Sequence, residues 1–207
     1  MQIDASIKNI VFDFGGVILN IDYTVTEQAF AKLGLKNFAT IYSQTTQKEL
    51  FDVFEKGLIS SVNFRKEIKK FINGNTSDEQ IDEAWKSMLL DLPEERVHLL
   101  DNLKKKYRLF LLSNTNEIHF TSFTAYMQKK FNRKIFTEVF DKYYVSHKIN
   151  MRKPDAEIFE LVLSENKLIR EETLFIDDSF QHIEGANKFV GLKTYFLKKR
   201  RNYPIRV

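Results

Sequence analysis

Five short runs along the chain consist mainly of apolar and aromatic residues. Three of them end in small polar or acidic residues: "NIVFD" ends at Asp13, "RLFLLSN" at Asn114 and "TLFIDDS" at Ser179. Two weaker runs are "KYYVS", ending at Ser146, and "TYFL" over residues 194–197. Because the apolar residues are continuous instead of alternating with polar ones, the pattern predicts strands buried on both faces, as in a parallel α/β sheet.

Helical patterns separate these runs. They cover residues 94–107, 116–131, 155–167 and 180–189. Strands that alternate with helices predict right-handed crossovers and a doubly wound parallel sheet. In such a sheet the functional crevice lies beyond the carboxyl ends of the strands, so the polar residues that end the runs are expected to meet at one edge.

The segment from residue 21 to residue 91 has a different pattern. It contains four amphipathic stretches with helical spacing and no strand-like run, and these stretches cover residues 24–35, 46–57, 61–72 and 77–90. Ser77 and Gln80 have the spacing of a capping box, and Gly34 and Gly57 are suited to helix ends. The sequence therefore predicts an α/β core made of residues 1–20 and 92–207, with a four-helix cap inserted at residues 21–91.

Composition limits the cellular setting and the partners. The 207 residues include no cysteine, which excludes disulfides, thiolate metal sites and a cysteine nucleophile. No apolar stretch approaches the roughly 18–20 residues that span a bilayer, and the first residues lack a signal-peptide pattern. The net charge is +4, concentrated in the basic run Lys198–Arg201, which is typical of a solvated tail. We expect a cytoplasmic protein without a membrane or nucleic-acid partner, present as a monomer or homodimer.

The polar residues at the strand ends form a chemically coherent set. It comprises three carboxylates, one cation, one hydroxyl and one amide, supplied by Asp13, Asp177, Asp178, Lys153, Ser113 and Asn114. Three acids on one edge would repel one another unless a cation lay among them. Oxygen ligands of this kind suit Mg²⁺, which binds through one or two carboxylates together with water and phosphate.

The same set fits phosphoryl transfer. A carboxylate can attack phosphorus and form an aspartyl-phosphate, while the ammonium of Lys153 and a metal ion offset the charge on the phosphoryl oxygens. Ser113, with backbone N–H groups near Asn114 and in the Phe14–Gly15 turn, is suited to hydrogen-bond the phosphate. Gly15 and Gly16 allow the backbone to approach an anion without a Cβ in the way.

Four segments resemble, in order, the four motifs of the haloacid dehalogenase superfamily. They are "IVFDFGGVIL", "LLSNTN", "RKPDAEIF" and "LFIDDS", with the helical cap inserted after the first. The resemblance implies Asp13 as nucleophile and metal ligand, the backbone carbonyl of Gly15 and the carboxylate of Asp178 as further ligands, and Asp177 as a ligand directly or through water. It also implies that Ser113 and Asn114 hold the phosphate and that Lys153 bridges nucleophile and phosphoryl group.

The resemblance implies a Mg²⁺-dependent phosphatase that acts on a small phosphorylated metabolite, a sugar phosphate by preference. The chain is similar to the branch that contains α-glucose-1-phosphate phosphatase. One alternative is a metal-independent 2-haloacid dehalogenase, which the pair Asp177–Asp178 disfavours because such a site has no cation to offset two further acids. Another is a weakly catalytic protein that binds phosphate for regulation.

Gly15 departs from the pattern of the familiar phosphatases of this superfamily, which carry a second Asp two residues after the nucleophile. That Asp is a general acid and base, a role that contributes about 10²–10⁴-fold to rate. Its absence predicts a preference for esters whose leaving group needs little protonation, such as anomeric, acyl or aryl phosphates. Asp22 is the nearest substitute acid by sequence, although an Asp at that position is also a typical helix N-cap.

The remaining polar and aromatic candidates have structural interpretations. Arg152 is expected to be a surface charge, and four histidines without metal-ligand spacing, His98, His119, His147 and His182, are expected at the surface or partly packed. Six aromatic residues are expected in the core of the cap, namely Phe38, Tyr42, Phe51, Phe54, Phe64 and Trp85. The turn around Gly57 is the expected specificity turn.

Overall fold

A computed structural model describes residues 3–35, 45–72 and 75–198 of the chain. Its centre is a five-stranded sheet in which every neighbouring pair of strands is parallel, in the order β3-β2-β1-β4-β5. The strands are β1 (Asn9–Phe12), β2 (Arg108–Ser113), β3 (Lys142–Val145), β4 (Thr173–Asp177) and β5 (Lys193–Phe196). The five predicted strands and the parallel doubly wound sheet are confirmed.

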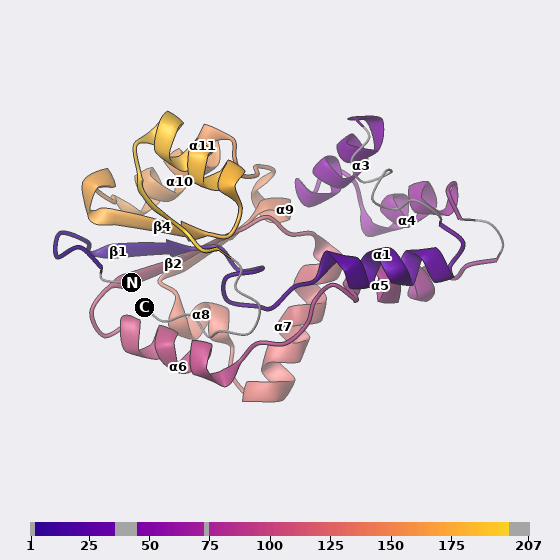
Figure 1. Ribbon diagram of the computed structural model, residues 1–207, viewed down its shortest axis with the longest axis horizontal. Helices are drawn as coiled ribbons and strands as arrows, with labels where there is room; N and C mark the ends of the chain where they lie inside the picture. The colour runs from indigo at the N-terminus through magenta and orange to yellow at the C-terminus, as the bar shows by residue number, and fades with distance from the viewer. Residues whose placement is uncertain (1–2, 36–44, 73–74, 199–207) are drawn as a thin grey trace.

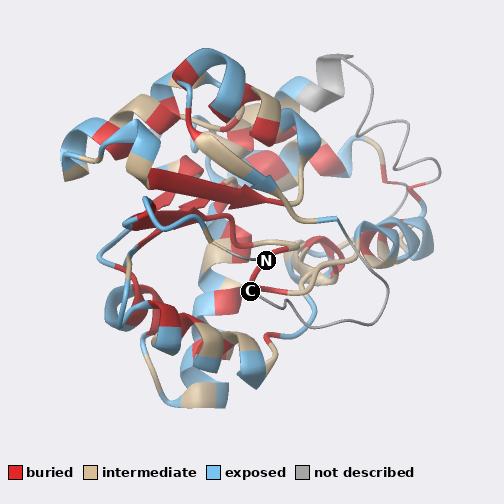
Figure 2. Cartoon of the chain, turned by 60° about the vertical axis from the view of Figure 1, so that its left-hand side comes forward, coloured by how far each residue is buried: buried red, intermediate tan, exposed pale blue. Residues whose placement is uncertain are grey.

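The sheet lies between two layers of helices (Figure 1). On one face, Ile10 and Leu111 pack with α6 (Glu94–Leu103), α7 (Glu117–Phe131) and α8 (Ile135–Val139). On the other face, Val11 and Phe110 pack with α10 (Ala156–Asn166) and α11 (Phe180–Val190). Successive residues of a strand point to opposite faces, so each central strand must be apolar throughout, and Figure 2 shows these strands as buried.

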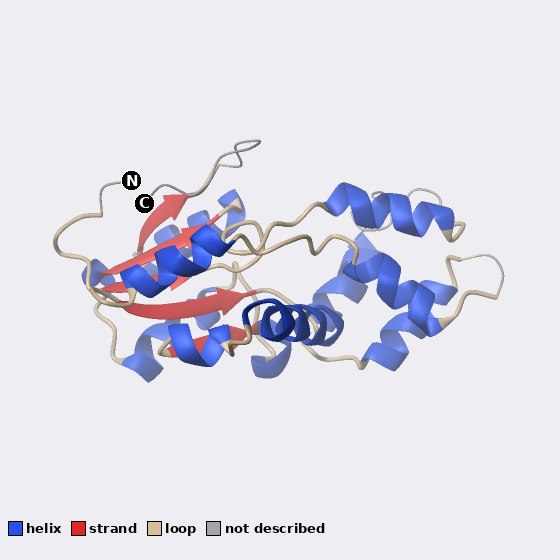
Figure 3. Cartoon of the chain, turned by 90° about the horizontal axis from the view of Figure 1, so that it is seen from below, coloured by secondary structure: helices blue, strands red, loops and turns tan. Residues whose placement is uncertain are grey.

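Among the described residues, a separate group beyond the carboxyl end of the sheet consists of helices α1 (Tyr23–Lys32), α3 (Thr45–Glu55), α4 (Ser61–Lys69) and α5 (Asp78–Lys86) (Figure 3). Their apolar faces enclose a cluster of their own, which includes Phe51, Phe54, Phe64 and Trp85 as predicted. Phe38 and Tyr42 lie outside the described residues, as does the basic run beyond Lys198.

Local signals in the cap sequence act as expected. The side chain of Ser77 accepts from the Gln80 backbone N–H, and the side chain of Gln80 accepts from the Ser77 N–H, so the capping box at the start of α5 is present. Gly34 and Gly57 follow α1 and α3 with positive φ, a conformation that glycine adopts without a steric cost. None of the described helices is long and apolar enough to cross a membrane.

Two chain passages connect the helical group to the sheet, and they lie side by side. Asn20 donates its backbone N–H to the carbonyl of Asp91 at 2.9 Å, and Asp22 donates to the carbonyl of Met88 at 2.9 Å. Ile21 pairs with Leu89 in an antiparallel bridge. These contacts occur where the sequence predicts the boundaries of the inserted segment.

Candidate active site

Three carboxylates meet at the carboxyl edge of the sheet. Asp13 follows β1, Asp177 ends β4 and Asp178 comes directly after it. One oxygen of each lies within 4.8 Å of the others. Asp13 and Asp177 are buried and Asp178 is half-buried. Parallel strands β1 and β4 are neighbours in the sheet, so the pairing that aligns Phe12 with Ile176 also brings the acids together.

Lys153 neutralises two of these acids. Its Nζ lies 2.7 Å from Asp13 Oδ1 and 2.7 Å from Asp177 Oδ2, and its side chain is 0% exposed. Burial raises the pKa of Asp13 to about 7, although the nearby ammonium of Lys153 acts in the opposite direction. The pKa of Lys153 is itself raised, because its two carboxylate partners outweigh the effect of burial. One ammonium among three acids leaves an excess of negative charge.

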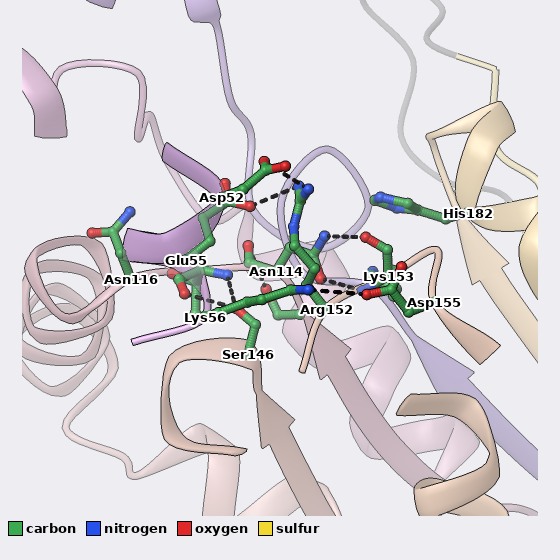
Figure 4. A network of polar contacts seen from close by, with 12 residues as sticks. Asp52, Glu55, Lys56, Asn114, Asn116, Ser146, Arg152, Lys153, Asp155 and His182 are labelled. Carbon is green, nitrogen blue, oxygen red and sulfur yellow. Dashed lines mark hydrogen bonds and ion pairs between the residues drawn. The ribbon is translucent and has the colours of Figure 1, made fainter. Parts of the chain in front are cut away.

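The carboxylate of Asp177 has Lys153, Ser179 and His182 as partners in the structure. Besides Lys153, its carboxylate accepts the backbone N–H of Ser179 at 2.7 Å and contacts His182 Nδ1 at 3.0 Å. Burial works to raise the pKa of Asp177, but Lys153 and His182 outweigh burial and lower it to about 2. Figure 4 shows His182 beside Lys153. His182 is partly packed, as expected from the sequence, but its contact with the acidic cluster was not predicted.

Gly16 brings the backbone after β1 against Asp178. A Cβ on Gly16 would lie 2.1 Å from Asp178 Oδ2, and the φ of Gly16 is +82°. The position therefore requires glycine both for its conformation and for its space. At Gly15, in contrast, a Cβ would meet only the side chain of Ile21, at an ordinary distance of 3.4 Å. The donor set beside this turn, three close carboxylates with one cation, fits a hard divalent cation such as Mg²⁺.

The predicted phosphate-binding residues occupy two kinds of position. Ser113 is buried and lines the same cavity as Asp13 and Phe14. The side chain of Asn114 forms two hydrogen bonds with the backbone of Lys153: its Nδ2 donates to the Lys153 carbonyl and its Oδ1 accepts the Lys153 N–H, both at 2.9 Å. Asn114 therefore positions Lys153. The ring of Phe14 packs in the core against Phe123, so its share in anion binding is limited to its backbone.

A cavity of about 230 Å³ opens above the acids, between the sheet and the cap. The core lines it with Asp13, Gly15, Ser113, Asn114 and Asp178, among others. The cap lines it with Ile21, Tyr23, Glu55, Trp85, Met88 and Leu89. Trp85 thus belongs both to the apolar cluster of the cap and to the wall of the cavity. The volume is below the roughly 300 Å³ at the lower end of pockets for drug-sized ligands, which favours a small metabolite.

Arg152 is not the surface charge that the sequence suggested. Its side chain is 20% exposed and lines the cavity, and its guanidinium pairs with two acids of α3, Asp52 at 2.7 Å and Glu55 at 2.8 Å. Figure 4 shows this guanidinium between the cap helix and the loop that carries Lys153. The prediction was wrong because the partners lie about 100 positions earlier in the chain, where no local pattern connects them.

His119 is packed more deeply than the surface or partly packed position expected from the sequence. It is buried, its Nδ1 lies 3.2 Å from Asn116 Nδ2 and its Nε2 lies 2.9 Å from the Trp85 carbonyl. Burial lowers the pKa of His119 to about 4, so the neutral ring joins the core to the cap at neutral pH. Asp22 is the N-cap of α1 and accepts the Thr24 N–H at 2.9 Å, which matches the structural interpretation of this acid.

Comparison with known proteins agrees with this geometry. A model of the family described as "Haloacid dehalogenase-like hydrolase" matches residues 10–196. The chain is 34% identical over 189 residues to a D-ribitol-5-phosphate phosphatase of Bacteroides thetaiotaomicron, and the match covers 91% of each chain. The resemblance to the α-glucose-1-phosphate phosphatase branch stays a prediction.

Solved structures give the same assignment. A HAD family enzyme of Bacteroides thetaiotaomicron, solved in complex with magnesium and inorganic phosphate, is 36% identical with a TM-score of 0.82, covering 95% of this chain and 97% of the other. A predicted HAD-like family hydrolase of Porphyromonas gingivalis is 30% identical with a TM-score of 0.85, covering 96% and 94%. An L-2-haloacid dehalogenase of Xanthobacter autotrophicus is 18% identical with a TM-score of 0.61, covering 91% and 76%, and this likeness concerns the fold alone.

Proposed function

The chain belongs to the haloacid dehalogenase-like hydrolase family, and from that premise we propose that it is a Mg²⁺-dependent phosphatase of small phosphorylated sugars or polyols. The observation that carries the proposal is the cluster of Asp13, Asp177 and Asp178 around the ammonium of Lys153. Further support comes from relatives named as a phosphatase and solved with magnesium and phosphate.

Asp13 is the nucleophile of this reaction. Its carboxylate attacks phosphorus, and the ester oxygen leaves with its carbon chain and takes a proton from water to form the alcohol. The phosphoryl group is carried on Asp13 until a water oxygen attacks phosphorus, breaks the bond to the carboxylate and releases inorganic phosphate and a proton. Lys153 Nζ, 2.7 Å from Asp13 Oδ1, holds this carboxylate in place and stabilises the negative charge that develops on the phosphoryl oxygens. The Ser113 hydroxyl, buried at the end of β2, donates to a phosphoryl oxygen.

Mg²⁺ would be held by Asp13, Asp178 and the Gly15 carbonyl. Asp177 would act through water, because its oxygens already have Lys153, Ser179 and His182 as partners. When bound, the ion supplies positive charge to offset the three acids and the phosphoryl group. A halide-displacing enzyme has no use for such an ion, which is why the acidic cluster supports the phosphatase over the dehalogenase.

Removal of the metal tests the proposed function. We expect the protein to release phosphate from sugar or polyol phosphates with Mg²⁺ and to lose this activity in EDTA, because three acids with one ammonium cannot accept a dianionic phosphate without a further cation. The measurement is inorganic phosphate release over a panel of sugar phosphates, polyol phosphates and 2-haloacids. Halide release that persists in EDTA, without phosphate release, would contradict the proposal.

Gly15 offers a gain-of-function prediction. The Gly15→Asp variant restores the general acid of the related phosphatases, and a Cβ fits there at 3.4 Å from Ile21. We expect its kcat for glucose 6-phosphate, an ester with a poor leaving group, to rise by about tenfold or more, while p-nitrophenyl phosphate changes little. We also expect the native enzyme to turn over glucose 1-phosphate faster than glucose 6-phosphate.

The matched control is Gly15→Asn, which adds a side chain of the same size that cannot transfer a proton. If the Asp and Asn variants have the same kcat ratio for the two kinds of ester, the leaving-group interpretation of Gly15 is wrong. Native turnover of glucose 6-phosphate that exceeds that of glucose 1-phosphate would count against it too.

A further inference from the structure

The cap contributes one charged side chain to the wall of the cavity, among the described residues. This residue is Glu55, at the C-terminal end of α3, while the other cap residues of the wall are apolar or aromatic. The side chain of Glu55 is 16% exposed. A carboxylate in such surroundings is costly unless it is paired or used.

Glu55 retains unused capacity to accept hydrogen bonds. Its Oε2 is buried and lies 2.8 Å from Arg152 Nη2. Within the described parts of the chain, Arg152 is the one group that pairs with this carboxylate. An ionised carboxylate offers about four acceptor sites, and buried acceptors are as a rule satisfied. The remaining sites are therefore open to a ligand in the cavity that carries hydrogen-bond donors.

Arg152 fixes the charge and the position of this carboxylate. Its Nη1 lies 2.7 Å from Asp52, one turn before Glu55 on α3, so the guanidinium forms ion pairs with two acids of the same helix. Burial raises the pKa of Glu55 above its usual value, and the charge of Arg152 limits this rise and so favours the ionised acceptor. Arg152 also directly precedes Lys153, which ties this acceptor to the reacting centre through one short segment of backbone.

The end of α3 is held against the core by further contacts (Figure 4). Lys56 Nζ lies 3.2 Å from Asp155 Oδ2, and the Lys56 carbonyl accepts from Asn150 Nδ2 at 2.7 Å. A Cβ on Gly57 would lie 2.1 Å from the His147 carbonyl, so the turn after α3 sits directly on the core. An acceptor held in this way loses little entropy when it binds a ligand.

We propose that the Glu55 carboxylate recognises the hydroxyl groups of the substrate by accepting hydrogen bonds from them. The enzyme then selects phosphorylated polyhydroxy compounds over other phosphate esters of the same size. The inference rests on the proposed phosphatase function and refines its substrate class. The phosphate lies at Asp13 and Ser113, and the hydroxyls of the carbon chain donate to the Glu55 carboxylate. The C–H groups of the chain contact the apolar wall, and a second anionic group is repelled by Glu55.

The test compares two five-carbon primary phosphate esters that differ in their hydroxyl groups, D-ribitol 5-phosphate and n-pentyl phosphate. We expect Glu55→Gln to lower kcat/KM for the ribitol ester by about 10- to 100-fold, the range for hydrogen bonds to a charged group, and to leave the pentyl ester unchanged. In an Asp13→Asn background without turnover, the same change should weaken binding of the ribitol ester and leave the Kd of inorganic phosphate unchanged.

The matched control is Asp52→Asn, which removes the other acid from Arg152 at a residue outside the wall of the cavity. It should keep the native ratio of kcat/KM for the two esters. Equal losses for both esters in Glu55→Gln, or no loss for either, would overturn the inference. If the native enzyme hydrolyses neither ester, the proposed function fails, and the binding comparison in the Asp13→Asn background still decides whether Glu55 recognises hydroxyls.

Discussion

Replacing Asp13 by Asn should lower kcat by about 10⁴-fold or more, with the fold retained. The carboxamide has the size of the carboxylate but is neutral and a poor nucleophile, so the step that forms the aspartyl-phosphate is lost. Lys153 keeps Asp177 as its partner at 2.7 Å, and the repulsion of Asp13 by Asp177 and Asp178 disappears. Steady-state phosphate release measures the loss of kcat, and a thermal unfolding curve measures whether the fold is retained.

A chemical trap identifies the nucleophile directly. Because Gly15 supplies no general base for the second step, we expect phosphoenzyme to accumulate, and protein quenched in acid during turnover should carry one phosphoryl group on the peptide that contains Asp13. The Asp13→Asn variant should carry none. Asp4→Asn, the same chemical change at an exposed residue, is the control and should keep native activity. Phosphate found on another peptide, or an Asp13→Asn variant with near-native kcat, would contradict the assignment.

The parallel sheet was predictable because its strands are buried on both faces. Runs such as residues 108–113 have no polar alternation, since one set of side chains packs under α6 and α7 and the other under α10 and α11. Polar residues at the ends of these runs then meet at one edge by the geometry of parallel strands alone. This is why Asp13, Asp177 and Asp178 could be expected to lie together from their positions at the ends of these runs.

The cap side of the cavity was less predictable, because it depends on where the cap docks. Glu55 and Asp52 belong to the polar face of an amphipathic helix, and nothing in that face indicates that Arg152 will cover it. His119 occupies one position of a helix that follows β2, and only the docked cap places the Trp85 carbonyl 2.9 Å from its ring. The specificity turn predicted around Gly57 was the one local prediction for a segment next to Glu55.

The glycine pair after Asp13 shows a similar limit. From the sequence, both Gly15 and Gly16 were expected to allow close approach of an anion. In the structure the close approach is made by Gly16 to the carboxylate of Asp178, while Gly15 has room for a side chain. Sterics therefore account for Gly16 and leave Gly15 to be explained by chemistry, which is why a substitution at Gly15 is informative.

Replacing Lys153 by Met should destabilise the metal-free protein by about 3–5 kcal/mol, the cost of leaving buried charges without their partner. The side chain is fully buried and its ammonium is 2.7 Å from both Asp13 and Asp177, so the variant removes the cation that pairs with both of these acids. Turnover should also fall, by about 10²–10³-fold, because a charge that stabilises the transition state is lost. Chemical denaturation in EDTA measures the loss of stability.

Mg²⁺ should reverse much of this loss of stability, and more so in the variant than in the native protein. A ligand that binds only the folded state raises its stability, and carboxylates that have lost their ammonium partner attract a divalent cation more strongly than a cluster that still holds it. The rise in melting temperature between EDTA and Mg²⁺ should therefore be larger for Lys153→Met.

Lys188→Met is the matched control: its ion pair with Glu184 has the same length of 2.7 Å, but Lys188 is 65% exposed. Exposed pairs contribute about 0–1 kcal/mol, so this control should unfold like the native protein in both conditions. If Lys153→Met were as stable as the control in EDTA, with no added response to Mg²⁺, the view that Lys153 and the metal share the neutralisation of these acids would have to be abandoned.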